Sequence, residues 1–186
     1  GGGGARGVGE DGIRGGKAAA LLHDSGKRAG PEHIRAKPGP LTQEEFQKIR
    51  IHPQVGAEII AAVPFPYPVA PLIMSHHERW DGKGYPECLR GEQIPLVARL
   101  IGLADSFDAM SSTRTYRSAL SRPQVLEEIA RCSGQQFDPS LALAFVRLDF
   151  SEFDRMVHEH QALEFNAANV NAVSDSLTPM KREEAA

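Results

Sequence analysis

The amino-acid sequence predicts an all-α protein, on three observations. Apolar residues recur at helical spacing in several stretches, and the longest of these, Val97 to Phe107, forms a wide apolar face. Prolines and capping residues separate the stretches into short helices. No stretch favours a β-sheet. The 186 residues suffice for one domain with a sizeable core, so we expect a single helical domain.

The amino-terminal part of the chain is rich in glycine and almost free of large apolar side chains over residues 1–16. Such a segment cannot bury enough apolar surface to offset the entropy lost on ordering, so we predict that it is disordered. Order is expected to begin near Lys17. The run Ala18 to Leu22 then predicts a short buried helix that ends at His23-Asp24.

Capping and proline signals place the next two helices. Thr42 and Glu45 have the spacing of a capping box and predict a helix that runs to Arg50. Pro53 directly follows His52, which predicts a break and then the first turn of a new helix, continuing to Ala62.

A group of prolines over residues 64–71 imposes the next boundary, and the apolar run Val69 to Met74 predicts a buried helix that leads into His76-His77. A loop with two glycines and a proline follows, up to Pro86. Paired imidazoles at the end of a buried helix, followed by a polar loop, predict a metal site with a flap that faces the substrate. The alternative is that both histidines are solvated polar residues.

The second half of the chain predicts further helices in order. They are the stretch that starts after Pro95, Arg122 to Cys132, Pro139 to Leu148 with Asp138 as its cap, and Phe150 to Leu163. The predicted organisation is therefore a disordered segment (1–16), a helical domain (17–148), and a carboxy-terminal helix with a frayed tail (149–186).

Composition and charge exclude several classes of protein. The formal net charge of -3 predicts no binding of a nucleic acid polymer, so an anionic ligand has to meet a local group of basic residues. Cys88 and Cys132 predict neither a disulfide scaffold nor a thiolate zinc site. No apolar run approaches the ~20 residues that span a bilayer. No signal peptide is apparent either, so we expect a cytoplasmic protein.

Residues of metal-ligand type recur at helix ends or on apolar helix faces. They are His23-Asp24, His52, His76-His77 and Asp105. Imidazole nitrogens and carboxylate oxygens suit divalent ions such as zinc, iron and manganese. A buried carboxylate costs several kcal/mol unless it is paired or bound to metal. Taken singly, a hydrogen-bonded core histidine or a capping carboxylate is the alternative; the six residues together favour a metal centre.

A series of motifs follows in order between residues 18 and 148. It comprises His23-Asp24-Ser25-Gly26-Lys27, Lys37 to Thr42, His52-Pro53, His76-His77-Glu78-Arg79 with Gly84-Tyr85-Pro86, Ile94-Pro95, Ala98-Arg99, Ala104 to Ala109, Arg114 to Arg117, Gly134 and Phe137-Asp138-Pro139. This series resembles the HD-GYP domain, a subgroup of the HD phosphohydrolase superfamily. A lone His-Asp pair would be a weak signal, whereas the ordered series is specific.

The resemblance implies a helical bundle that holds two or three divalent metal ions, with iron or manganese the first choices. It also implies hydrolysis of cyclic di-GMP, a bacterial second messenger, to the linear dinucleotide or GMP. The implied metal ligands, carried over by position, are His23, Asp24, His52, His76, His77 and Asp105.

Residues for the substrate are implied in the same way. They are Lys27, Tyr85, Asp108, Arg114 and Arg117, with Asp24 and Lys27 as the catalytic residues. The basic side chains would meet phosphates, which arginine can engage through two hydrogen bonds at once. Tyr85 would stack on a guanine.

One feature of the resembled family lies outside this sequence. Its members carry a further helix before the His-Asp pair, which supplies another metal ligand, and no histidine precedes His23 here. We therefore expect an HD-domain bundle without that helix, and a site at least one ligand short.

Two hypotheses about the function follow. The first is a metal-dependent phosphodiesterase, which the intact ligand set favours. The second is a catalytically impaired module that binds cyclic di-GMP or a protein such as a diguanylate cyclase, which the missing helix favours.

Overall fold

The computed structural model describes residues 9–29, 34, 37, 39–113 and 118–159. Over these residues the backbone is helical, and the only pairing of β type is an isolated bridge between Ser133 and Phe137. The predicted all-α class is therefore confirmed. The chain divides into two compact units, Gly1–Val146 and Arg147–Ala186, close to the predicted boundary at residue 148.

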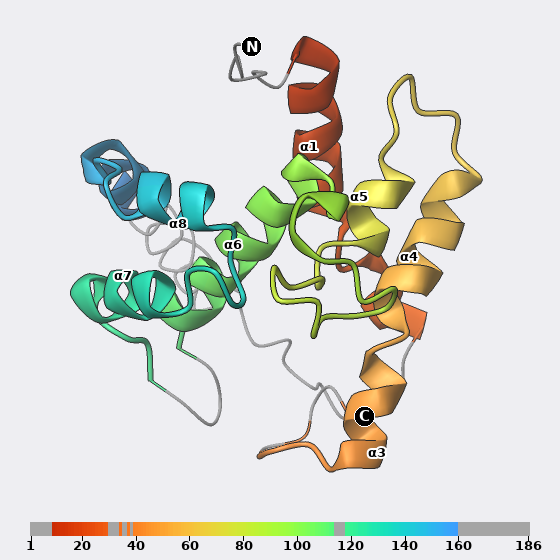
Figure 1. Ribbon diagram of the computed structural model, residues 1–186, viewed down its shortest axis with the longest axis horizontal. Coiled ribbons are helices and arrows are strands. Elements are labelled where there is room, and N and C mark those ends of the chain that lie inside the picture. Colours follow the sequence, from red (N-terminus) through yellow and green to blue (C-terminus); the bar gives the residue numbers. More distant parts are fainter. Residues whose placement is uncertain (1–8, 30–33, 35–36, 38, 114–117, 160–186) are drawn as a thin grey trace, which may run out of the picture. The chain divides into compact units, whose positions relative to one another are not determined.

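The first unit contains the elements that carry the predicted site (Figure 1). In chain order they are α1 (Glu10–Leu22), η1 (Ser25–Ala29), α3 (Gln43–Ile49), α4 (His52–Ala61), α5 (Ala70–Met74), η2 (Gly91–Gln93), α6 (Leu96–Ser111), α7 (Arg122–Arg131) and α8 (Pro139–Phe145). In the second unit residues 151–159 are helical, and the rest of the predicted carboxy-terminal helix and tail lies outside the described residues. No described helix combines the length and the apolar character needed to cross a membrane.

Local hydrogen bonds set several helix ends as the sequence predicts. The Thr42 hydroxyl accepts from the Glu45 N–H, and the Glu45 carboxylate accepts from the Thr42 N–H, so the capping box at the start of α3 is complete. The Asp138 carboxylate accepts from the N–H groups of Ser140 and Leu141 and caps α8. Each contact satisfies backbone donors that the first helical turn leaves without partners.

Helix α1 corrects the prediction for the amino-terminal segment. It begins at Glu10, so the prediction of disorder is wrong for residues 10–16, while residues 1–8 lie outside the described part. A Cβ atom on Gly15 would lie 3.3 Å from the Tyr67 ring, and one on Gly16 would lie 2.9 Å from a Val97 methyl group. The glycines therefore let α1 approach its neighbours closely. This packing stabilises a helix that intrinsic propensity disfavours.

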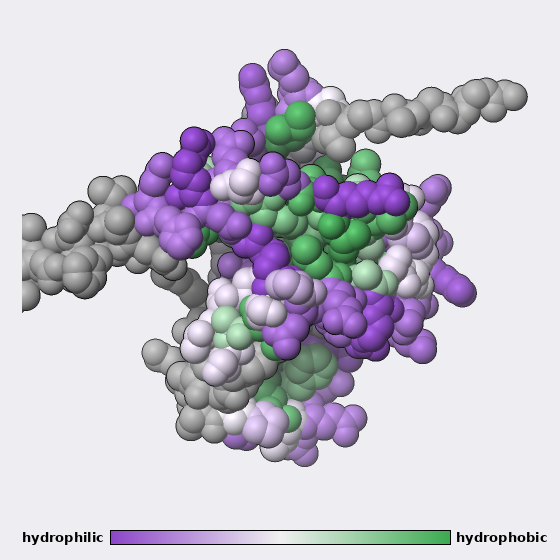
Figure 2. Space-filling model, turned by 90° about the vertical axis from the view of Figure 1, so that its left-hand side faces the viewer, coloured by the Kyte–Doolittle hydropathy of each residue, from purple (hydrophilic) through white to green (hydrophobic). Residues whose placement is uncertain are grey.

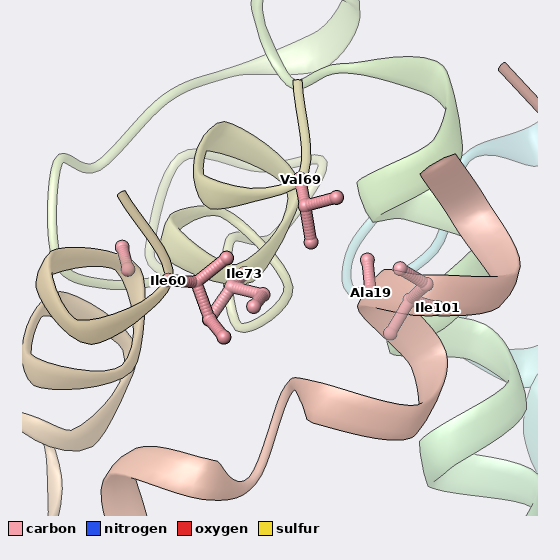
Figure 3. Close-up of a cluster of buried hydrophobic side chains, with 6 residues drawn as sticks. Ala19, Ile60, Val69, Ile73 and Ile101 are labelled. Atoms are coloured by element: carbon pink, nitrogen blue, oxygen red, sulfur yellow. The ribbon is translucent and has the colours of Figure 1, made fainter. Parts of the chain in front are cut away.

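The core of the first unit lies where α1, α4, α5 and α6 meet (Figure 3). Its buried members are Ala19, Ala57, Ile60, Val69, Ile73 and Ile101. Helix α4 packs against α5 and η1, and α1 packs against α5 and α6. The carboxy-terminal ends of α1 and α5 and the amino-terminal end of α4 are therefore held against one core. Five of the six predicted metal ligands lie at these ends, and the sixth, Asp105, lies within α6.

Replacing Ile73 with alanine tests the role of this core. Ile73 is fully buried, so its loss should lower the free energy of unfolding by about 2–5 kcal/mol through lost burial and a residual cavity. Ile59→Ala on the neighbouring α4 is the control, because Ile59 is 50% exposed and should cost about 0.5 kcal/mol or less. Urea unfolding followed by circular dichroism measures both. Equal losses for the two variants would contradict the assignment of the core.

Apolar side chains also gather on the surface, as the space-filling view shows for one face (Figure 2). A groove of about 530 Å³ lies between α1 and α6 and is lined mainly by apolar side chains, among them the exposed Ile13 and Leu100. His23, Asp105 and Asp108 line the same groove. The groove therefore reaches the residues predicted to bind metal and substrate.

Candidate metal centre

Three imidazole rings from two helix ends converge at the centre of the predicted site. His52 is the first residue of α4, and His76 and His77 follow α5. The Nε2 atom of His52 lies 3.4 Å from that of His76 and 3.2 Å from that of His77. Each of the three histidines offers a ligand atom within 4.8 Å of the others. This cluster could hold a metal ion.

A shared backbone contact orients three of the site's imidazoles. The Nδ1 atom of His23 lies 2.7 Å from the Ala20 carbonyl oxygen, three residues earlier in the chain. The Nδ1 atoms of His52 and His76 make the same contact, each with the carbonyl oxygen three residues before it. An Nδ1–H that donates to a carbonyl leaves Nε2 with a free lone pair. The helix ends thus turn the Nε2 atoms of these three histidines toward the site in the tautomer that binds metal.

The carboxylates complete the group from the other side. Asp24 Oδ1 lies 3.5 Å from His23 Nε2 and 3.9 Å from His52 Nε2. Asp105 Oδ1, from α6, lies 3.7 Å from His23 Nε2. The rings of His23 and His76 meet edge to face with centroids 5.1 Å apart. The structure therefore brings together all six residues predicted as metal ligands.

Gly26 permits the close approach of α4 to the His-Asp pair. Gly26 follows Asp24 by two residues and is buried against the first turn of α4. A Cβ atom on Gly26 would lie 2.0 Å from the His52 carbonyl oxygen and 2.7 Å from the Gly56 nitrogen. No real Cβ atom comes so close to backbone. The distance between Asp24 and His52 thus depends on the absence of a side chain at Gly26.

Burial and neighbouring charges give the two sides of the site different electrostatics. Burial lowers the pKa of His76 to about 4 and that of His77 to about 2, and it also lowers the pKa of His52. The close polar contact with Asp105 raises the pKa of His23, and the same contact lowers the pKa of Asp105 to about 2. The three clustered imidazoles are therefore neutral and Asp105 is ionised at neutral pH, as metal ligands must be.

The donor atoms fit a divalent cation. Among the described residues, His23 Nε2 and Asp24 Oδ1 are buried without a hydrogen bond of good geometry, although the Lys27 ammonium lies 2.7 Å from Asp24 Oδ1. Buried polar atoms without partners are costly. The Nε2 lone pairs of His52 and His76, 3.4 Å apart, repel each other unless a cation lies between them. Nitrogen and oxygen donors in this combination suit iron, manganese or zinc.

A network of hydrogen bonds holds the loop after the two histidines. The buried Glu78 carboxylate accepts from the N–H groups of Glu87 (2.7 Å) and Leu89 (3.1 Å). Arg79 donates to Asp81, and the Trp80 N–H donates to the Gln136 carbonyl oxygen. The loop is thereby fixed to its own far end and to the turn before α8. Glu78 belongs to one of the sequence motifs, but the sequence assigns it no function, because its hydrogen bonds are to backbone groups nine and eleven residues further along the chain.

Two of the predicted substrate residues, Lys27 and Tyr85, border the centre. Lys27 pairs with Asp24, and the Tyr85 ring stacks on His77 with centroids 4.9 Å apart. Burial raises the pKa of Tyr85 to about 12, so its hydroxyl stays protonated. Asp108 is exposed on α6. Arg114 and Arg117 lie outside the described residues.

Two residues near Tyr85 are absent from the sequence-based prediction. The Arg50 guanidinium lies 4.6 Å from the centre of the Tyr85 ring, and Phe46 meets the same ring edge to face. Their positions at the end of α3, just before His52, are a signal that could have indicated them. The contact with Tyr85, however, joins residues far apart in the sequence.

Comparison with known proteins relates this arrangement to a family. Residues 12–141 match the profile of the HD domain. A cyclic di-GMP phosphodiesterase of Vibrio cholerae is 41% identical over 138 residues, which are 70% of this chain and 28% of the relative. A cyclic di-GMP phosphodiesterase response regulator of Xanthomonas campestris is 40% identical over 143 residues, 76% of this chain and 38% of the relative.

Relatives with another substrate in their names also match. A 3'3'-cGAMP-specific phosphodiesterase of Vibrio cholerae is 37% identical over 127 residues, 67% of this chain and 24% of the relative. A solved cyclic GMP-AMP specific phosphodiesterase from V. cholerae superposes with a TM-score of 0.56 at 22% identity, over 81% of this chain and 44% of that one. This likeness confirms the fold. The chain spans less than two fifths of the length of each curated relative named here.

Proposed function

This chain belongs to the HD-domain family, and on that premise we propose that it is a metal-dependent phosphodiesterase. Its proposed reaction is the hydrolysis of cyclic di-GMP to the linear dinucleotide or GMP. The observation that carries the proposal is that four imidazoles and two carboxylates converge on one point. They come from the turn between α1 and η1, from the start of α4, from the end of α5 and from α6. The names of relatives about 40% identical support the substrate.

Six residues hold the metal ions in this proposal. They are His23, Asp24, His52, His76, His77 and Asp105. His52, His76 and His77 form one group, and Asp24 lies between His52 and His23, which suits a carboxylate that bridges two ions. We propose two or three ions, with iron or manganese as the first choices. When bound, such ions polarise a phosphodiester and supply a nucleophile at neutral pH.

The remaining residues bind and orient the substrate. Lys27, 2.7 Å from Asp24 Oδ1, keeps this carboxylate in place and brings positive charge to the side where a phosphate would lie. Tyr85 covers His77 and excludes water from that side of the site. Asp108, Arg114 and Arg117 are also proposed to contact the substrate, as the motifs they belong to suggest.

Metal content and turnover test the proposal together. The purified chain is expected to retain divalent metal by elemental analysis and to hydrolyse cyclic di-GMP when Mn²⁺ or Fe²⁺ is added. A chelator should abolish turnover. The same assay with 3'3'-cGAMP distinguishes the two substrates named for the relatives. Metal-loaded protein that binds cyclic di-GMP without hydrolysing it would contradict the enzyme and support the binding module instead. A diguanylate cyclase is a further proposed partner of such a module.

A further inference from the structure

Three side chains form a cluster beside the metal centre that carries a positive charge between aromatic rings. Phe46 and Arg50 lie one helical turn apart at the end of α3, and Tyr85 comes from the loop after α5. The Arg50 guanidinium carbon lies 4.6 Å from the centre of the Tyr85 ring and 6.0 Å from that of Phe46. The two rings are 6.4 Å apart and nearly perpendicular. We call these three residues the aromatic–arginine cluster.

The cluster extends from the metal centre to the surface. At its inner end the Tyr85 ring stacks on His77, with an angle of 29° between the rings, and the Tyr85 N–H donates to the His77 carbonyl oxygen. At its outer end Phe46 is 44% exposed. A ligand that reaches the metal ions at His77 can therefore touch the cluster with a neighbouring group.

Arg50 keeps a charge that its neighbours do not neutralise. The nearby cations Lys27 and Lys37 pair with Asp24 and Glu45 at 2.7 and 2.6 Å. Within the part of the chain that the structure describes, Arg50 has ring contacts but no carboxylate within ion-pair distance. A guanidinium that lies over a ring retains N–H donors in its own plane. Arg50 is therefore available to an acceptor on a ligand.

We propose that the aromatic–arginine cluster recognises a guanine base of the substrate. This inference rests on the proposed function and assigns part of its specificity to two residues, Phe46 and Arg50. Arginine donates two parallel hydrogen bonds to the O6 and N7 atoms of guanine, whereas adenine carries an amino group in place of O6. Aromatic rings stack on the face of a base. The Arg50 guanidinium beside the exposed Phe46 ring thus fits a guanine next to the scissile phosphate and disfavours an adenine.

Binding to metal-loaded protein tests the assignment. For Arg50→Met we expect the dissociation constant for cyclic di-GMP to rise about 10- to 100-fold, since one bidentate contact to a base is lost. The preference for cyclic di-GMP over cyclic di-AMP should fall by a similar factor. Arg50→Lys keeps the charge but lacks the two parallel N–H donors of a guanidinium, so it should also lose the preference for cyclic di-GMP. Phe46→Ala should weaken binding of both dinucleotides.

A substrate without a base separates recognition from chemistry. Arg50→Met should keep its metal, and its hydrolysis of bis(p-nitrophenyl) phosphate should fall far less than its affinity for cyclic di-GMP. Arg122→Met is the matched control, because Arg122 lies over Phe107 in the same kind of contact at the start of α7. It should leave the binding of both dinucleotides unchanged.

The possible outcomes distinguish this inference from the proposed function. Unchanged selectivity in Arg50→Met would overturn the inference, as would a parallel loss of metal and of base-free hydrolysis, which would make Arg50 structural. A wild-type chain that does not bind cyclic di-GMP would also overturn it. If the wild-type chain binds cyclic di-GMP through Arg50 but hydrolyses neither substrate, the inference stands and the proposed function fails.

Discussion

Replacing Asp24 with alanine should remove bound metal and lower the rate of cyclic di-GMP hydrolysis at least ~100-fold. Asp24 Oδ1 lies within 4 Å of His23 Nε2, His52 Nε2 and Lys27 Nζ, so its loss takes a shared oxygen from the middle of the ligand group. Changing residues that only support metal ligands already costs ~10–100-fold in metal affinity or activity. Loss of a ligand itself should cost no less.

Metal analysis after dialysis and single-turnover hydrolysis measure these effects. Lys83→Ala is the matched control, because the Lys83 side chain is exposed and its charge acts on Asp81, which is not a predicted metal ligand; the Lys83 N–H donates to the Asp81 carboxylate, and the substitution keeps this backbone contact. This variant should keep both metal and activity. Asp24→Ala protein that retains full metal content would show that the imidazoles alone hold the ions, and Asp24 would no longer be a ligand.

Replacing Gly26 with alanine should destabilise the protein and separate the two sides of the metal centre. The new Cβ atom would lie 2.0 Å from the His52 carbonyl oxygen, which is backbone and cannot rotate away. Helix α4 would have to move relative to η1, and His52 would move with it. Overpacking of this kind typically costs about 1–3 kcal/mol. Because the clash is with backbone, we expect a loss of about 3 kcal/mol.

Thermal unfolding and metal affinity should fall together in Gly26→Ala. Gly9→Ala serves as the control, since a Cβ atom at Gly9 meets nothing within 4 Å. A Gly26→Ala protein with unchanged melting temperature and metal affinity would refute the close contact between η1 and α4. Loss of stability without loss of metal affinity would show that the site tolerates a shift of α4.

The electrostatics of the centre explain how six polar side chains can lie together in one partly buried place. Burial holds the clustered imidazoles neutral, so they add no positive charge that would repel a cation. The negative charge comes from Asp24 and Asp105, and the Lys27 ammonium lies 2.7 Å from Asp24 Oδ1.

Much of this protein could be predicted from its sequence, because the signals are local. The capping pair Thr42 and Glu45 and the cap Asp138 act within one helical turn, and both are confirmed. Helical periodicity and prolines predict most of the elements from α3 to α8. The six proposed metal ligands lie at helix ends or on an apolar helix face, and ordered motifs mark them, so the sequence alone indicates these residues.

Only the tertiary structure decided three further features, because each depends on contacts between distant parts of the chain. Residues 10–16 are helical although their glycines predict disorder, since Gly15 and Gly16 let α1 pack closely on its neighbours. Gly26 looks like an ordinary turn glycine until α4 is seen against it. In the sequence Arg50 resembles any surface cation. Its contact with an aromatic ring arises only because the loop after α5 brings Tyr85 against its guanidinium group. Propensity and spacing describe a segment by itself, whereas backbone contact and ring stacking depend on which segments meet.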